Sequence, residues 1–88
     1  MLFVTMVRFR KRPTKETINA IRNGLIAAKD RGVENTMCVY LLGRHDIMAI
    51  SEAPDVKTFM KAALRFGDYV STETLVAIPA EEIEDEIE

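Results

Sequence analysis

Apolar residues occupy both faces of the strand-like segments in this chain, and this pattern restricts its fold more than any other feature. Successive side chains of a strand point to opposite sides of a sheet. A sheet with helices on one side only should therefore alternate apolar and polar residues. Three segments instead carry apolar residues on both faces. In the first, Leu2, Val4 and Met6 lie on one face and Phe3, Val7 and Phe9 on the other. The second has Met37, Val39 and Leu41 against Cys38, Tyr40 and Leu42, and the third has Ile47 and Ala49 against Met48 and Ile50.

Two segments have the periodicity of amphipathic helices. Apolar residues recur at three- and four-residue steps within 15–30 and again within 56–66, as on a helix with one face against a core. Thr14 and Asp55 precede these segments and are predicted to cap their first turns. Gly32 suits the left-handed position after the first helix. The two helices cover one face of a sheet and leave its other face open.

The order of the elements predicts an α+β fold of the ferredoxin-like type, β-α-β-β-α-β. Right-handed crossovers place both helices on one face of a four-stranded antiparallel sheet. A short acidic helix is expected to follow the last strand, so we divide the chain into a domain at 1–78 and a helical tail at 79–88. The expected strands are residues 1–9, 35–42, 45–52 and 69–78.

The second apolar sheet face predicts self-association. Soluble monomers rarely expose an apolar patch of this size, and the tail at 79–88 is too short and too acidic to cover it. We therefore expect two copies to pack sheet against sheet as a homodimer, or a higher homo-oligomer, in the form of a dimeric α/β barrel.

Composition excludes several classes of protein. The chain has 88 residues, enough for one small domain, and no apolar run long enough to span a membrane. We therefore expect a cytoplasmic protein without a membrane partner. Cys38 is the only cysteine and His45 the only histidine, which argues against a disulfide or a transition-metal site built by one chain. No phosphate-binding loop or dinucleotide fingerprint occurs, so no cofactor is expected.

Charge divides unevenly along the chain. Residues 1–44 hold nine Lys or Arg and three Asp or Glu, whereas residues 45–88 hold three and eleven. The basic stretch RFRKRPTK at 8–15 contains one aromatic residue, and the overall pI is acidic, so we expect no nucleic-acid partner. A solvated loop, facing the acidic tail of another copy, is the favoured interpretation of this stretch.

The stretch LLGRHDIMAISEAPD, followed by STETLVAI, resembles the GYD-domain family. That family's signature is a leucine-glycine-x-tyrosine-aspartate turn, an apolar strand, EAPD, and a later TETL strand. His45 stands where the family has its tyrosine. The resemblance implies a dimeric α/β barrel and no established activity; the same fold resembles effector-binding domains of amino-acid-responsive transcription regulators and small cofactor-free monooxygenases. The matching residues are Gly43, Asp46, Glu52, Ala53, Pro54, Asp55, Thr72, Glu73, Thr74 and Leu75.

Four polar residues are candidates for a ligand site: Tyr40, His45, Asp46 and Glu73. His45 and Asp46 are adjacent on an extended segment, so they point to opposite faces and cannot easily form one dyad. Asp46 also suits a turn, where its carboxylate accepts backbone N–H groups. Tyr40 shares a face of its strand with Cys38 and Leu42. Glu73 lies in the middle of the last strand, on the face of Ser71 and Leu75.

Our hypothesis from sequence is a non-enzymatic, homo-oligomeric domain of the GYD type. It includes a small-molecule effector site at the barrel or subunit junction and no catalytic residues. One alternative is a cofactor-free enzyme of the small monooxygenase kind, with Tyr40, His45 and Glu73 around the cavity. The other is a stand-alone effector-binding partner of a transcription regulator, which would not contact DNA itself.

Overall fold

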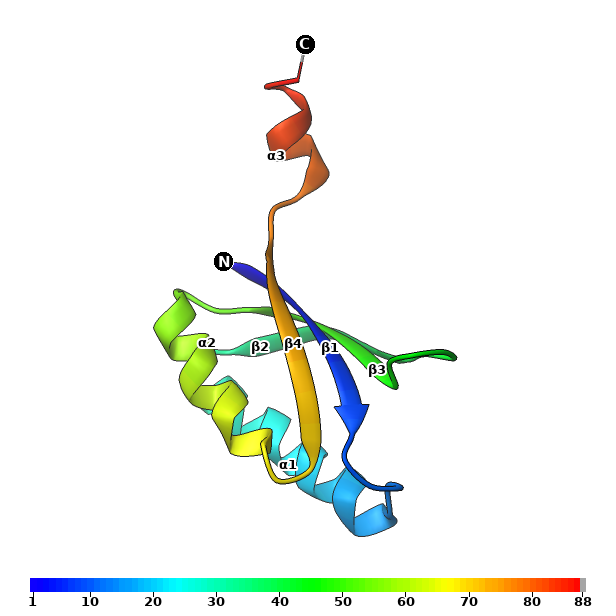
Figure 1. The fold of residues 1–88 in the computed structure, drawn as a ribbon. Coiled ribbons are helices and arrows are strands. Elements are labelled where there is room, and N and C mark those ends of the chain that lie inside the picture. The colour runs from blue at the N-terminus through cyan, green and yellow to red at the C-terminus, as the bar shows by residue number, and fades with distance from the viewer. Residues whose placement is uncertain (88) are drawn as a thin grey trace.

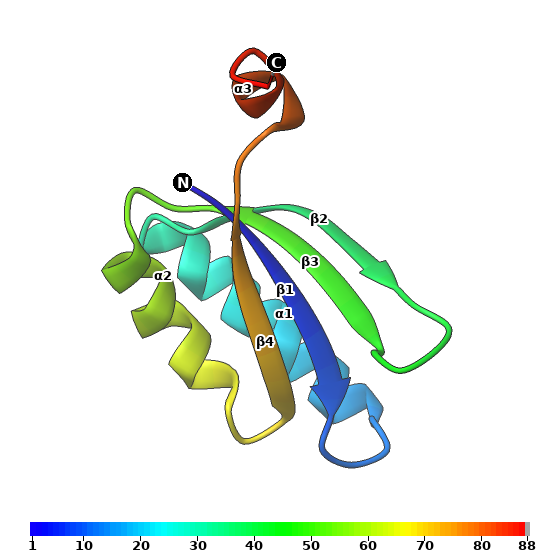
Figure 2. The same ribbon diagram turned by 45° about the horizontal axis from the view of Figure 1, so that its top comes forward.

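The computed structural model describes residues 1–87 and shows an α+β domain with one sheet and two long helices on the same face (Figure 1). The sheet is antiparallel throughout, with the strand order β2-β3-β1-β4 (Figure 2). This is the predicted ferredoxin-like arrangement. The elements are β1 (Leu2–Phe9), α1 (Lys15–Asp30), β2 (Glu34–Tyr40), β3 (Ile47–Glu52), α2 (Val56–Ala63) with a 3₁₀ turn at Leu64–Phe66, β4 (Val70–Ala77) and α3 (Ala80–Glu84).

Local capping fixes where the helices begin and end. The Thr14 hydroxyl accepts a hydrogen bond from the Thr17 N–H at 3.2 Å. The Asp55 carboxylate accepts one from the Thr58 N–H at 2.7 Å. Both contacts satisfy first-turn donors that have no partner within the helix. Gly32 has φ +96°, the left-handed conformation predicted for it.

Several expected elements are longer than the observed ones, most of all at the connection between β2 and β3 and in the tail. β2 ends at Tyr40 and β3 begins at Ile47, so residues 41–46 form the connecting loop. The tail helix covers only Ala80–Glu84 of the predicted 79–88, and residue 88 lies outside the described residues. Two effects explain the early end of this helix. Acidic side chains near a helix C-terminus interact unfavourably with the helix dipole, and a short helix gains few hydrogen bonds to offset the cost of its first turn.

Two groups of buried residues form the core between the helices and the sheet. In the first, the rings of Phe3 and Phe59 stack with centroids 4.2 Å apart and planes 9° apart, joining β1 to α2. This group contains Phe3, Ala28, Val33, Ala53, Phe59 and Ala62. The second contains Val7, Ile47 and Val70, with Phe9, Ile21 and Phe66 packed against it.

Candidate functional site

An apolar cavity of about 100 Å³ lies between the helix layer and the sheet. Both buried groups contribute to its walls, so the cavity separates one half of the core from the other. Its walls are almost entirely apolar. The lining residues are Thr5, Val7, Ile21, Leu25, Ala28, Val33, Cys38, Ile47, Ala49, Ser51, Phe59, Ala62, Ala63, Phe66, Val70 and Thr72.

Small side chains at core positions create this space. Protein interiors are normally packed with few voids larger than a water molecule. Here five of the lining positions carry Ala or Ser instead of larger side chains, namely Ala28, Ala49, Ser51, Ala62 and Ala63. Side chains that line an unfilled apolar space lose van der Waals contacts, which lowers stability. The sequence patterns do not predict the cavity; the small residues on the inward faces are its only signal in the sequence.

Few polar groups reach the cavity. Ser51 is buried, and its hydroxyl lies 3.4 Å from the Asn35 side-chain nitrogen, which donates to it. Cys38 lines the cavity but is also exposed, so the cavity meets solvent beside β2. Partial burial raises the pKa of the Cys38 thiol. The thiol is therefore protonated at neutral pH and a weak nucleophile there.

Asp46 has a structural contact to β1. Its Oδ2 accepts a hydrogen bond from the Phe9 N–H at 2.8 Å, and its own N–H donates to the Val7 carbonyl at 2.8 Å. Both bonds tie the loop at 41–46 to the end of β1. This is the turn role considered for Asp46 from sequence. His45 lies in the same loop and is half-buried.

Tyr40 and Glu73 lie on opposite faces of the sheet. Tyr40 pairs with Ile47, which is buried on the helix side, although Tyr40 itself is 67% exposed at the edge. Glu73 pairs with Met6 on the open side. One copy therefore does not bring these two side chains together. None of the four predicted ligand residues, all within the described part of the chain, lines the cavity.

The open face of the sheet is largely apolar, as the sequence pattern predicted. Phe3 and Val7 are buried on the helix side, so the alternate residues of β1 point away from the helices. Strand register places apolar neighbours beside them, such as Met48 opposite Met6. Figure 2 shows both long helices on the far side of the strands. The apolar residues of this face are Leu2, Val4, Met6, Met37, Val39, Met48, Ile50 and Leu75.

The strand order and the one-sided helices define a ferredoxin-like domain with an uncovered sheet face and an internal apolar cavity. The model of the GYD domain matches residues 3–87, nearly the whole chain. The chain therefore belongs to the GYD-domain family. No curated protein matches it.

Solved structures of similar fold include two small proteins. The crystal structure of SCO4226 from Streptomyces coelicolor A3(2) is 20% identical, with a TM-score of 0.59, and the match covers 89% of this chain and 99% of that one. The de novo designed protein Foldit4 is 16% identical, with a TM-score of 0.55, and the match covers 89% and 100%. At these identities the likeness supports the fold alone.

Residues 1–87 contain neither a candidate membrane-spanning helix nor a candidate metal-ligand cluster. No helix there is both long enough and apolar enough to cross a bilayer. No three His, Cys, Asp or Glu side chains in that range gather as metal ligands would.

Proposed function

We propose that this protein is a homodimeric binding domain, and that each copy holds a small, largely apolar molecule between its helices and its sheet. The observation that carries the proposal is the cavity of about 100 Å³ with almost purely apolar walls. Ligand sites are typically apolar hollows with a few polar groups that orient the ligand. An empty hollow of this kind lowers stability, and a bound ligand restores the missing contacts.

The size and lining of the cavity define the class of ligand. A single aromatic ring, or a short branched hydrocarbon chain, is the size of ligand that this space favours. At most one or two polar atoms are accommodated, since the hydroxyl groups of Thr5, Ser51 and Thr72 are the neutral hydrogen-bonding side chains of the wall. A charged ligand is disfavoured because burying an unpaired charge is costly.

The lining favours binding over catalysis. General acid–base chemistry needs a group that gains or loses a proton near neutral pH and reaches the substrate. Cys38 is the one titratable residue of the lining, and burial raises its thiol pKa away from neutrality. Tyr40, His45 and Glu73, the residues of the monooxygenase alternative, lie outside the lining. The proposal therefore places the ligand inside each copy rather than at the subunit junction.

The dimer completes the proposal by covering the open sheet face. Met6, Met48 and their apolar neighbours form a surface that two copies can bury against each other. Packing the two open faces together removes this surface from water, and each Å² of apolar surface buried stabilises the dimer by roughly 25 cal/mol. Glu73 shares this face and would lie at the junction of the two sheets.

The Cys38 thiol provides a direct test of ligand binding, because it is the only thiol of the chain and lines the cavity. We expect indole or toluene to slow its reaction with a water-soluble disulfide reagent in a saturable way. Filling the cavity with Ala49→Phe should remove the protection by the ligand. Ile26→Phe, at an exposed position of α1, is the matched control and should leave it intact. Unchanged thiol reactivity at saturating indole and toluene would contradict the proposed site.

A further inference from the structure

A second apolar surface lies outside the core, in the groove between α2 and the edge strand β4. Val56 and Met60 of α2 and Leu64 of the 3₁₀ turn that follows recur every fourth residue and are 43%, 54% and 77% exposed. Val76 of β4 faces them and is 56% exposed. We call this surface the α2/β4 groove. It differs from the open sheet face, because Val76 and Phe3 belong to the helix side.

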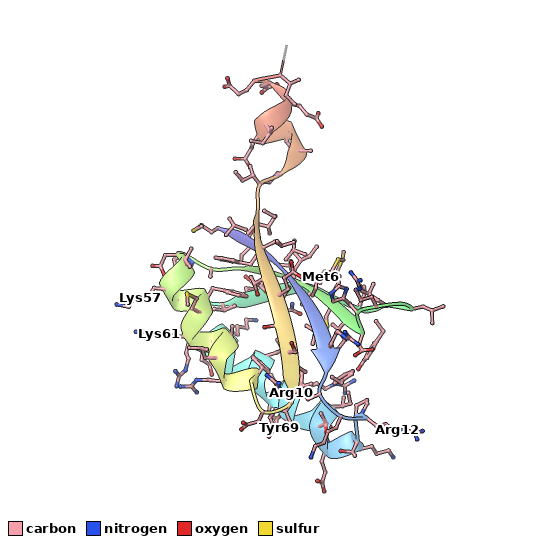
Figure 3. The ribbon with its side chains drawn as sticks, viewed as in Figure 1. Met6, Arg10, Arg12, Lys57, Lys61 and Tyr69 are labelled. Atoms are coloured by element: carbon pink, nitrogen blue, oxygen red, sulfur yellow. The ribbon has the colours of Figure 1, made fainter. Side chains whose placement is uncertain are left out.

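Basic side chains flank the groove. Lys57, Lys61 and Arg65 each follow one of its apolar residues by one position, so they form a parallel row further from the sheet. Figure 3 shows Lys57 and Lys61 extending outward from α2. Arg10 lines the other end, where its Nε donates to the Gly67 carbonyl at 2.7 Å.

The C-terminal tail has the complementary pattern. Within residues 79–87, Ile83 and Ile87 are four apart and are 45% and 68% exposed. The other side chains are mostly acidic: Glu81, Glu82, Glu84, Asp85 and Glu86. The tail thus has two apolar residues among acidic ones, and the α2/β4 groove has a row of apolar residues beside a row of basic ones. The two isoleucines are four positions apart in the sequence, as are Met60 and Leu64 on the groove.

The tail of one copy points away from its own groove. The chain leaves β4 in line with the strand, and α3 stands beyond the end of the sheet in both views (Figures 1 and 2). Pro79, with φ −54° and ψ 139°, holds an extended backbone where the tail begins. A return to the same copy's groove would require the chain to reverse at this point.

We propose that residues 79–87 of one copy dock into the α2/β4 groove of a second copy. Ile83 and Ile87 contact the Val56, Met60 and Leu64 row, and the tail carboxylates face Lys57 and Lys61. The inference rests on the proposed association of copies and adds a second, charge-dependent contact to it. Exchange of tails also covers part of the exposed β4 edge, which is otherwise free to pair with other strands.

Disulfide trapping between two differently labelled copies tests this contact. In a Cys38→Ser background, a chain with Ile83→Cys is mixed with a chain carrying Met60→Cys and is oxidised. We expect a cross-linked heterodimer at least tenfold more abundant than with Ile26→Cys, an exposed position of α1, in place of Met60→Cys. Salt at 1 M should lower the yield, because screening weakens the charge pairing.

Charge reversal provides a second, independent test. Lys57→Glu with Lys61→Glu on the groove should lower the cross-link yield at least fivefold. Glu82→Lys with Glu86→Lys on the partner's tail should restore it. If the reversed groove lowers the cross-link yield and the reversed tail does not restore it, the proposed charge pairing is wrong. Circular dichroism of each variant checks that the domain remains folded.

The remaining outcomes separate this inference from the proposed function. A chain carrying both Met60→Cys and Ile83→Cys that cross-links only within itself would overturn the exchange in favour of a folded-back tail. Absence of any cross-link, while sedimentation still shows a dimer, would overturn tail docking and leave the sheet-face dimer standing. A monomer in sedimentation would overturn both.

Discussion

The Asp46 carboxylate accepts a hydrogen bond from the Phe9 N–H at 2.8 Å, across 37 positions of sequence. This bond joins the loop between β2 and β3 to the last residue of β1. A charged acceptor on a backbone donor is among the stronger hydrogen bonds in proteins. The architecture of the sheet therefore gives the family-matching aspartate of this turn a structural role.

Replacing this carboxylate should destabilise the fold without affecting ligand binding. Asp46→Ala leaves the part-buried Phe9 N–H without its acceptor, and we expect a loss of about 2 kcal/mol. Asp68→Ala, at an exposed position, should cost much less. Urea unfolding at one protein concentration measures both. Equal losses for the two variants would show that the Phe9 contact contributes little.

Gly24 is predicted to resist substitution although it lies within a helix. Alanine in place of glycine usually stabilises a helix by about 1 kcal/mol. A Cβ at this position would lie 2.5 Å from Cε1 of Phe66, too close for the ring to stay in place. We expect Gly24→Ala to lower the free energy of unfolding by about 1 kcal/mol overall, since overpacking outweighs the helical gain.

A second substitution isolates the contact with Phe66. In a Phe66→Leu background the clash is relieved, so Gly24→Ala should become neutral or stabilising. A double-mutant cycle from thermal unfolding gives the coupling between the two positions. Stabilisation by Gly24→Ala in the unchanged protein would contradict the close packing of α1 against Phe66.

The cap of α2 predicts a loss of stability in acid. The hydrogen bonds from the Thr58 N–H, and secondarily from its hydroxyl, hold the pKa of Asp55 below its ordinary value. A carboxyl group with a depressed pKa stabilises the fold above its unfolded pKa, about 3.9 for aspartate. This contribution is lost as pH falls through the lower, folded pKa.

Asp55→Asn separates this effect from general acid denaturation. Asparagine is a good N-cap and does not titrate. Melting temperatures measured from pH 5 to pH 2 should therefore fall less steeply for Asp55→Asn than for the unchanged protein. Asp68→Asn serves as the control and should retain the original slope. Parallel curves for all three proteins would exclude a contribution from this cap.

The open sheet face predicts how the dimer can be broken. Met6→Asp places a second carboxylate beside Glu73, its register partner on β4, and two like charges are costly to bury together in the proposed interface. We expect sedimentation equilibrium at micromolar concentration to give twice the 10.0 kDa chain mass for the unchanged protein and a single chain mass for the variant. Ile26→Asp on α1 should remain dimeric. A monomeric unchanged protein would contradict the proposed dimer.

The fold could be predicted from the sequence because its determinants are local. Strand alternation, the caps at Thr14 and Asp55 and the left-handed Gly32 depend on a few neighbouring residues, and the structure confirms them. The face assignments of Tyr40 and Glu73 follow from alternation alone and are also confirmed. The positions of strand ends depend on more distant contacts, since hydrogen bonds to β1 fix the loop at 41–46.

The candidate site could not be predicted in the same way. The cavity arises where small residues from different elements, Ala28, Ala49 and Ala62 among them, meet across the core. Each alanine alone is an ordinary core residue, so no local pattern reveals the space. The site residues predicted from sequence are polar instead, because polar side chains carry most recognisable chemistry. Asp46 then proved to hold a backbone contact that depends on tertiary structure.

The central claim, that each copy binds a small apolar molecule inside its core, is tested most directly by NMR titration. Two-dimensional ¹H–¹⁵N spectra are recorded during addition of benzene, toluene or indole. We predict saturable shifts at the amides of Ala49, Ala62 and Phe66, and their loss in folded Ala49→Phe but not in Ile26→Phe. Spectra unchanged up to the solubility limit of all three compounds, or equal shifts in Ala49→Phe, would contradict the claim.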